Sequence, residues 1–107
     1  MRYVLQVTSS AKPGRDADYV QWYKDVHMWE VMEVPGFLSC QRFQHIDPKT
    51  GAGAYVAAYD VETDNPGALL ESLMAAAPKM KMTDAIDFSS VRFEFLKPLG
   101  NREQKKA

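Results

Sequence analysis

The order of strand-type and helix-type segments along the chain, β-α-β-β-α-β, predicts an α+β fold of the ferredoxin-like class. Such a fold has an antiparallel four-stranded sheet with helices on one face. Two further observations favour it: both helical segments carry one apolar stripe, and a strong turn sequence separates the second strand from the third. The chain of 107 residues suits a single domain. We expect that domain to span residues 1–99, with residues 100–107 as a polar C-terminal tail.

The first half of the chain is predicted to be a strand followed by a long helix. Residues 2–8, RYVLQVT, alternate in polarity and are rich in β-formers. Residues 9–14 form a loop, and a helix then spans about Arg15 to Glu33 before Pro35-Gly36 stops it. At about 100° per residue, one face of this helix is aromatic and apolar. That face carries Tyr19, Trp22, Tyr23 and Val26, with Trp29 at its flank.

The middle of the chain is predicted to be a β-hairpin. Residues 37–45, FLSCQRFQH, and residues 54–61, AYVAAYDV, have strand composition. Between them, residues 47–51 supply an Asp-Pro to open a turn and a Gly for positive φ. The two strands should therefore pair antiparallel.

The last part of the chain is predicted to hold the second helix and the fourth strand. Asn65-Pro66-Gly67 opens the helix and Pro78 ends its regular part. Residues 79–88 are expected to be irregular with one helical turn, and residues 90–96, SVRFEFL, form the strand. The apolar stripe of the helix consists of Leu69, Leu70, Leu73, Met74 and Ala77.

Alternation assigns the strand side chains to two sheet faces. The more apolar set is expected against the helices: Tyr3, Leu5, Val7, Phe43, Tyr55, Tyr59, Phe93 and Phe95. The opposite set mixes Val4, Leu38, Cys40, Val56, Ala58 and Leu96 with Gln6, Arg42, Asp60, Arg92 and Glu94. That face is too apolar to be left wholly wet, so we expect it to pair with a second copy in a homodimer.

The bulk composition excludes several classes of function. Thirteen basic and fourteen acidic side chains give a net charge of −1, which offers no attraction to nucleic acid or anionic membranes. A single cysteine favours a reducing compartment. The N-terminus does not have the pattern of a signal peptide, and no apolar run is long enough to cross a bilayer, so we expect a cytoplasmic protein. No phosphate-binding glycine loop is present, and we expect no cofactor.

The run WYKDVHMWEVMEVPGFLSCQRF, preceded by KPGRDADY, resembles the EthD-like families of the dimeric α+β barrel superfamily. The elements that carry the resemblance are Trp22-Tyr23, His27, Glu30, Val34-Pro35-Gly36-Phe37 and Arg42-Phe43. Relatives often have Leu-Pro after the histidine, where this chain has Met28-Trp29. The resemblance implies a homodimer that closes two sheets into a barrel, with a ligand cavity between each sheet and its helices. It leaves the reaction open, because this superfamily hosts many chemistries.

Three residues are candidates for catalysis. Imidazole can move protons in both directions near neutral pH, and His27 lies at the edge of the apolar helix face, so it is the leading acid–base candidate. Glu30 falls near the middle of the apolar stripe if the helix is regular, where an unpaired carboxylate is costly. It could orient His27 or take a proton itself. Tyr59 could hold a substrate oxygen. Each also has a structural interpretation: a boundary histidine, a surface acid past a helix bend, and a core tyrosine.

A second set of residues is expected to line the ligand cavity. It consists of Tyr23, Tyr3, Gln41, Tyr55, Trp29 and Phe93. A metal site at His27 and Glu30, with His45 as a third ligand, is weakly supported, because one pair at i,i+3 has no second ligand pair beside it. Cys40 lacks a nearby acid–base partner in the sequence and is expected to be a buried structural thiol.

These residues predict a small cofactor-independent enzyme. It would perform acid–base chemistry of the isomerase, cyclase or lyase type on an apolar, oxygenated small molecule, one derived from an aromatic compound. Two alternatives stay open: a cofactor-free monooxygenase, and a non-catalytic binding or accessory protein of a degradative pathway. Haem or metal handling is a third possibility.

Overall fold

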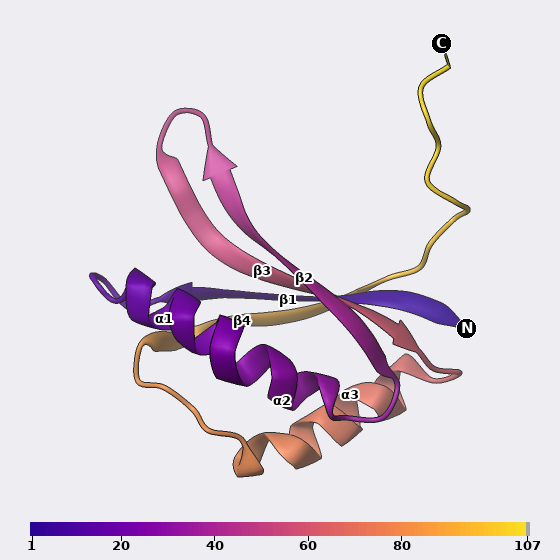
Figure 1. Ribbon diagram of the computed structural model, residues 1–107, viewed down its shortest axis with the longest axis horizontal. Coiled ribbons are helices and arrows are strands. Elements are labelled where there is room, and N and C mark those ends of the chain that lie inside the picture. Colours follow the sequence, from indigo (N-terminus) through magenta and orange to yellow (C-terminus); the bar gives the residue numbers. More distant parts are fainter. Residues whose placement is uncertain (107) are drawn as a thin grey trace.

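The computed structural model describes residues 1–106 and has the predicted ferredoxin-like architecture (Figure 1). Four antiparallel strands form one sheet in the order β2-β3-β1-β4, and the helices lie on one face of it. Along the chain the elements are β1 (Arg2–Ala11), α1 (Asp16–Trp22), η1 (Tyr23–His27), α2 (Met28–Met32), β2 (Phe37–Asp47), β3 (Gly51–Glu62), α3 (Pro66–Ala76), η2 (Ala77–Lys79) and β4 (Ile86–Leu96). The β2–β3 hairpin extends beyond the other two strands (Figure 1).

Strands β1 and β4 are longer than the sequence predicts, because their ends pair with each other. Ser10 pairs with Asp87 and Ala11 with Ile86, although residues 9–14 were expected to be a loop and residues 79–88 irregular. An irregularity between Thr8 and Ser10 separates this stretch from the main β1–β4 pairing. The expected loop and the expected irregular segment are therefore each shorter than predicted.

A bulge at the start of β2 reverses the expected assignment of its side chains. Phe37 pairs with Val61, but the register shifts before Ser39, which pairs with Asp60. Cys40 then pairs with Tyr59 and Arg42 with Ala57, which puts both on the helix-covered face. Gln41 and Phe43 pair with Ala58 and Val56 on the opposite face. The predicted faces of these four β2 residues are wrong, because one extra residue in a strand exchanges the two faces.

The first helical segment covers the predicted range but changes its winding in the middle. The backbone N–H of Met28 donates to the carbonyl of Tyr23, five residues back, so η1 is a turn of π-helix. The chain continues on either side as α1 and α2 without a proline. A π-turn has more residues per turn than an α-helix. It therefore alters which side chains share a face from Trp22 onward.

The helix-covered face of the sheet holds the hydrophobic core. Leu5, Tyr59 and Val61 are fully buried, and they pack against Tyr19 and Tyr23 from the first helical segment. Burial of one such apolar side chain contributes about 1.5–3 kcal/mol. Leu69 and Leu73 of α3 complete the core on the same face. Within residues 1–106, nothing forms a covering layer on the opposite sheet face.

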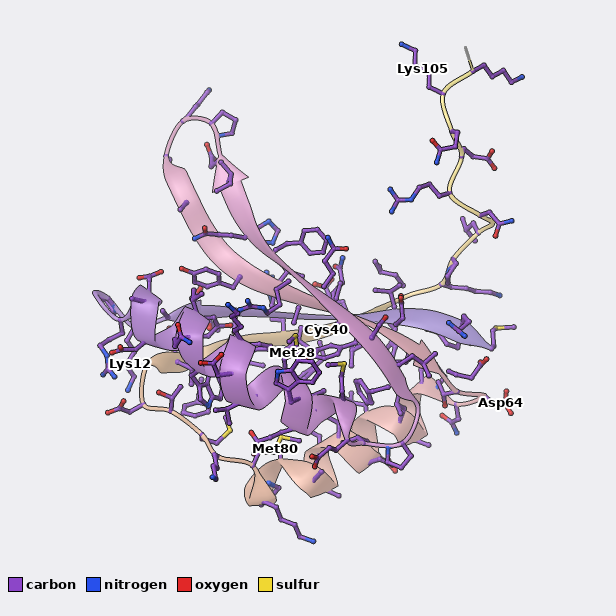
Figure 2. The ribbon with its side chains drawn as sticks, in the orientation of Figure 1. Lys12, Met28, Cys40, Asp64, Met80 and Lys105 are labelled. Atoms are coloured by element: carbon purple, nitrogen blue, oxygen red, sulfur yellow. The ribbon has the colours of Figure 1, made fainter. Side chains whose placement is uncertain are left out.

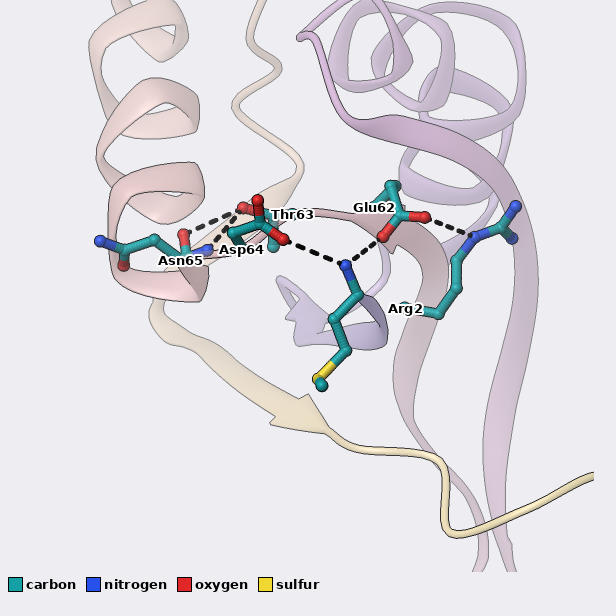
Figure 3. A network of polar contacts seen from close by, with 6 residues as sticks. Arg2, Glu62, Thr63, Asp64 and Asn65 are labelled. Carbon is teal, nitrogen blue, oxygen red and sulfur yellow. Dashed lines mark hydrogen bonds and ion pairs between the residues drawn. The ribbon is translucent and has the colours of Figure 1, made fainter.

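Polar contacts hold the end of the sheet where the chain begins (Figure 3). The amino group of Met1 contacts the carboxylates of Glu62 and Asp64, and Arg2 lies 3.5 Å from Glu62. A few residues on, the side chain of Asn65 accepts a hydrogen bond from the Ala68 N–H and caps α3, as the sequence predicts. These exposed contacts join the start of β1 to the β3–α3 connection.

Candidate functional site

A cavity of about 240 Å³ lies between the helices and the β1–β4 half of the sheet. Its walls come from β1, β4, the first helical segment, α3 and the connection from η2 to β4. The lining is largely aliphatic, thioether and aromatic. It consists of Val7, Ser9, Tyr23, His27, Val31, Leu73, Met74, Ala77, Met80, Met82, Ile86, Phe88, Val91 and Phe93. Of the predicted site residues, the cavity brings together His27, Tyr23 and Phe93.

Two buried hydroxyl pairs lie at the wall of this cavity. The phenol oxygens of Tyr23 and Tyr59 are 2.9 Å apart, and Tyr59 itself is fully buried behind Tyr23. Ser9 Oγ is hydrogen-bonded to the phenol oxygen of Tyr19. In both pairs either oxygen could be the donor. Tyr59 therefore reaches the cavity only through its partner Tyr23.

His27 is held by aromatic rings on two sides. Its imidazole stacks on the Trp22 indole with ring centroids 4.5 Å apart and planes 16° from parallel. The ring of Tyr23 meets it edge-on at 5.1 Å. Trp22 precedes His27 by five residues, so the π-turn is what brings the two rings to the same side of the helix.

The third partner of His27 is Glu30. His27 Nδ1 lies 3.7 Å from Glu30 Oε1, and the side chains are only 15% and 21% exposed. Both atoms are buried, and neither has a hydrogen-bond partner within residues 1–106. The separation is too long for a hydrogen bond, so the contact acts mainly through charge. The other carboxylate oxygen, Oε2, accepts a hydrogen bond of 2.8 Å from the backbone N–H of Lys81.

Burial sets the protonation of the site. Desolvation lowers the pKa of His27 from its ordinary 6.5, and the charge of Glu30 only partly opposes that effect. The imidazole is therefore neutral at pH 7. Burial likewise raises the pKa values of Tyr23 and Tyr59 well above 10, so both phenols stay protonated and can donate hydrogen bonds. The site thus offers a neutral base beside a neutral donor.

The other predicted lining residues lie away from this cavity. Tyr55 donates a 2.7 Å hydrogen bond to Asp16 and stacks on Tyr19. Tyr3 meets Phe95 edge-on at the other end of β1. Gln41 is exposed on the helix-free face, which corrects its predicted place in the cavity.

Trp29 is also displaced from its expected position. Its side chain is 58% exposed and its indole N–H donates to the carbonyl of Lys24, so it does not line the cavity. Trp29 was expected to line the cavity and Trp22 was not among the expected site residues, whereas Trp22 is the indole that contacts His27. The α-helical period could not show this, because it places residues five apart on different sides of the helix.

Other parts of the site were missed for a different reason. Met80 and Met82 line the cavity from a segment without regular structure. Figure 2 shows Met80 near the C-terminal end of α3 and η2. Ser9 also lines the cavity, although it was expected to be in a loop. Neither segment has a periodic pattern from which the direction of its side chains could be predicted. Arg42 reaches the helix layer, where its Nη1 donates a 3.3 Å hydrogen bond to the Val20 carbonyl.

Neither a metal-binding cluster nor a membrane-spanning helix occurs among residues 1–106. Within residues 1–106, no three His, Cys, Asp or Glu side chains are grouped so that they could hold a metal ion. His45 lies on the exposed arm of the β2–β3 hairpin and does not join His27. Among the same residues, no helix has the length and apolar character needed to span a membrane.

No protein-family model and no curated protein matches the chain, whereas several solved structures match its fold. The heme-degrader MhuD from Mycobacterium tuberculosis, with two hemes bound in its active site, has a TM-score of 0.60 at 15% identity, covering 94% of this chain and 99% of that one. A monooxygenase from the gene ActVA-Orf6 of Streptomyces coelicolor, in complex with nanaomycin D, has a TM-score of 0.58 at 20% identity, covering 96% and 92%. A nipsnap family protein with unknown function from Agrobacterium tumefaciens has 0.56 at 15%, covering 91% and 87%. These likenesses show a shared ferredoxin-like α+β fold, and membership of the EthD-like families and of the dimeric α+β barrel superfamily stays a prediction.

Proposed function

We propose that the chain is a small cofactor-independent enzyme that moves a proton on an apolar, oxygenated small molecule bound in the 240 Å³ cavity. The observation that carries this proposal is the position of His27. Among the lining residues it alone has an ordinary pKa near neutrality, and it stands in an otherwise apolar wall with its imidazole neutral. A neutral imidazole out of water is suited to act as a general base.

The neighbours of His27 suggest how the proton would move. Nδ1 is turned toward Glu30, and a proton on Nδ1 would be favoured by that carboxylate. The lone pair would then lie on Nε2, which we assign as the base. Tyr59 can donate its proton to the Tyr23 oxygen, which would leave the Tyr23 hydroxyl free to hold a substrate oxygen. Tyr59 would thus orient Tyr23 and would not touch the substrate.

The size of the cavity favours a small ligand. Pockets that hold drug-sized molecules occupy about 300–1,000 Å³, and this one is smaller. A molecule of one or two fused rings with a carbonyl or hydroxyl group fits such a volume better than a haem. The fold shared with MhuD makes haem the competing ligand. A Soret band from added hemin that is lost on His27 substitution would favour haem over the small molecule.

Assembly into a homodimer is part of the proposal. The bulge in β2 adds Phe43, 50% exposed, to Val4, Val56, Ala58 and Leu96 on the helix-free face. Phe43 replaces Cys40 in the set expected from the sequence and makes that face more apolar. Pairing of this face with a second copy would remove the apolar area from water.

The test exploits the two tryptophans. In a Trp29→Phe background, Trp22 is the remaining indole and it touches His27. We expect 2-tetralone, a bicyclic ketone with acidic α-hydrogens, to quench Trp22 fluorescence and to exchange those hydrogens in deuterated water. His27→Gln should retain the quenching and lose the exchange. Quenching without exchange in either protein would favour a binding protein, and oxygen uptake with a phenol would favour a monooxygenase.

A further inference from the structure

The backbone of Lys81 is held from both sides by residues of the first helical segment. Its N–H donates a 2.8 Å hydrogen bond to Glu30 Oε2, and its carbonyl accepts a 2.8 Å hydrogen bond from Trp22 Nε1. Lys81 belongs to residues 80–85, the segment that leads from η2 to β4, which we call the strap. Met80 and Met82, its neighbours on either side, line the cavity. The two bonds therefore fix the strap against the helix beside the cavity.

The two residues that hold the strap also contact His27. Glu30 uses one carboxylate oxygen for Lys81 and turns the other toward His27 Nδ1. Trp22 uses its indole N–H for Lys81 and its ring face for the imidazole. A movement of the strap would consequently change the surroundings of His27 through both residues at once.

We propose that Glu30 and Trp22 are positioning residues that couple the strap to His27, so that the strap closes on the cavity while the imidazole is neutral and opens when it is protonated. The buried, unpartnered His27 Nδ1 and Glu30 Oε1 supply the reason. A protonated imidazole attracts the carboxylate into a true hydrogen bond, which draws Glu30 away from Lys81. The protonated imidazole is also better solvated by water, and water can reach the ring when the strap is open.

Few other charges face this arrangement. Tyr23 is the other titratable residue of the cavity wall, and it stays protonated. On the far side of Glu30, a neighbouring hollow is lined by Glu33 and by Lys79 at the end of η2. The strands contribute no ionisable side chain to the described cavity lining. Glu30 is therefore the charge through which His27 and the strap communicate.

The chain allows a matched pair of variants at one position. Lys81→Pro removes the N–H that Glu30 accepts, while Lys81→Ala removes the side chain and keeps that N–H. Met80 already has φ −83° and ψ 151°, the extended conformation that a residue before proline prefers. Trp22→Phe is an independent variant, because it keeps a ring for His27 and removes the donor to the Lys81 carbonyl.

This inference rests on the proposed function for the role of His27. Its readouts need neither a substrate nor activity, so a failure of the inference can be told apart from a failure of the proposed function. The chain has two histidines, and the exposed His45 is an internal reference for the carbethoxylation of His27 by diethyl pyrocarbonate at about pH 8. Loss of a hydrogen bond to a charged group should raise the His27 rate about ten- to a hundredfold in Lys81→Pro. Trp22→Phe should raise it in the same direction, and Lys81→Ala should leave it unchanged.

NMR titration of His27 gives the second readout. The pKa of His27 should rise in Lys81→Pro, because Glu30 is then free to pair with it. It should fall in Glu30→Gln, which removes the charge and still offers an oxygen to Lys81. Equal effects of Lys81→Pro and Lys81→Ala would overturn the coupling, and so would an unchanged His27 rate in a folded Trp22→Phe protein.

Discussion

The phenol oxygens of Tyr23 and Tyr59 lie 2.9 Å apart in the buried layer between the first helical segment and β3. Only Tyr23 faces the cavity, and Tyr59 is fully buried. The sequence analysis expected Tyr59 to hold a substrate oxygen and Tyr23 to line the cavity, whereas in the structure Tyr59 reaches the cavity only through Tyr23. Each hydroxyl is the partner that makes burial of the other tolerable.

Tyr59→Phe should lower the free energy of unfolding by about 1–2 kcal/mol, because the buried Tyr23 hydroxyl loses its partner. The double variant Tyr23→Phe/Tyr59→Phe should lose less than the sum of the single variants, with a coupling of about 1 kcal/mol. Urea titrations of the four proteins measure this cycle. Additive losses would show that the two hydroxyls do not depend on each other.

Cys40 should react slowly with alkylating reagents. It packs beside Tyr59 on the covered face, and burial raises its pKa to about 11. At about pH 8 only about one thiol in a thousand would be ionised in the folded protein. Iodoacetamide should modify native protein far more slowly than urea-unfolded protein, as followed by mass spectrometry. Equal rates would place the thiol in solvent.

The position of Cys40 shows how far sequence alone predicts this fold. Composition and turn chemistry predict each strand, and the order of the segments predicts the sheet. A bulge depends on backbone pairing between two strands, which no single-strand pattern contains, so the faces of Cys40, Gln41, Arg42 and Phe43 could not be predicted. An error of one residue there exchanges candidate site residues with candidate interface residues.

Phe43 offers a test of assembly, because the bulge in β2 places it on the helix-free face. Phe43→Asp should convert a homodimer to monomer, because it puts a charge on the apolar helix-free face. An obligate interface of this kind buries roughly 2,000 Å² or more. Trp29→Lys is the control, since Trp29 is as exposed but lies on α2. Light scattering should report a dimer for wild type and control and a monomer for Phe43→Asp, and a monomeric wild-type chain would contradict the pairing.

The candidate site could be predicted in part. His27 and Tyr23 were identified because their chemistry and helical spacing are visible in the sequence. The stacking of Trp22 on His27 depends on a π-turn. The hydrogen bond from Lys81 to Glu30 joins residues 51 apart, and its donor is a backbone N–H that every residue type except proline has. Local periodicity contains neither kind of information.

The stability of the protein should depend on pH through His27. Its pKa in the unfolded chain is near the ordinary 6.5, and burial lowers it in the folded chain. Between those two values the unfolded chain binds more protons, so stability rises with pH. The contribution is complete above 6.5 and is lost as the pH falls through the folded pKa. Urea titrations should show that the free energy of unfolding of wild type minus that of His27→Gln decreases as the pH falls from 6.5 through the folded pKa. A difference that does not change with pH would contradict burial of the imidazole.

Substitution of His27 should lower the turnover rate more than it lowers the stability of the fold. If His27 is the base, His27→Ala should lower turnover by about 10²- to 10⁴-fold, which is the usual contribution of general acid–base catalysis. That loss corresponds to about 3–5 kcal/mol of barrier. The rate for wild type should rise with pH through the lowered pKa of His27, because the neutral imidazole is the active form. Removal of His27 should eliminate that rise.

A purely structural histidine would give the opposite pattern. Its loss would lower the melting temperature through the lost stack with Trp22, while activity per folded molecule and its pH profile stayed unchanged. Glu30→Gln supplies the intermediate case. It leaves the imidazole in place and removes the charge beside Nδ1, so the proposed base would become weaker and the rise in rate would move to lower pH. Rates for wild type, His27→Ala and Glu30→Gln across pH, each corrected for the folded fraction, therefore separate a catalytic His27 from one that only packs.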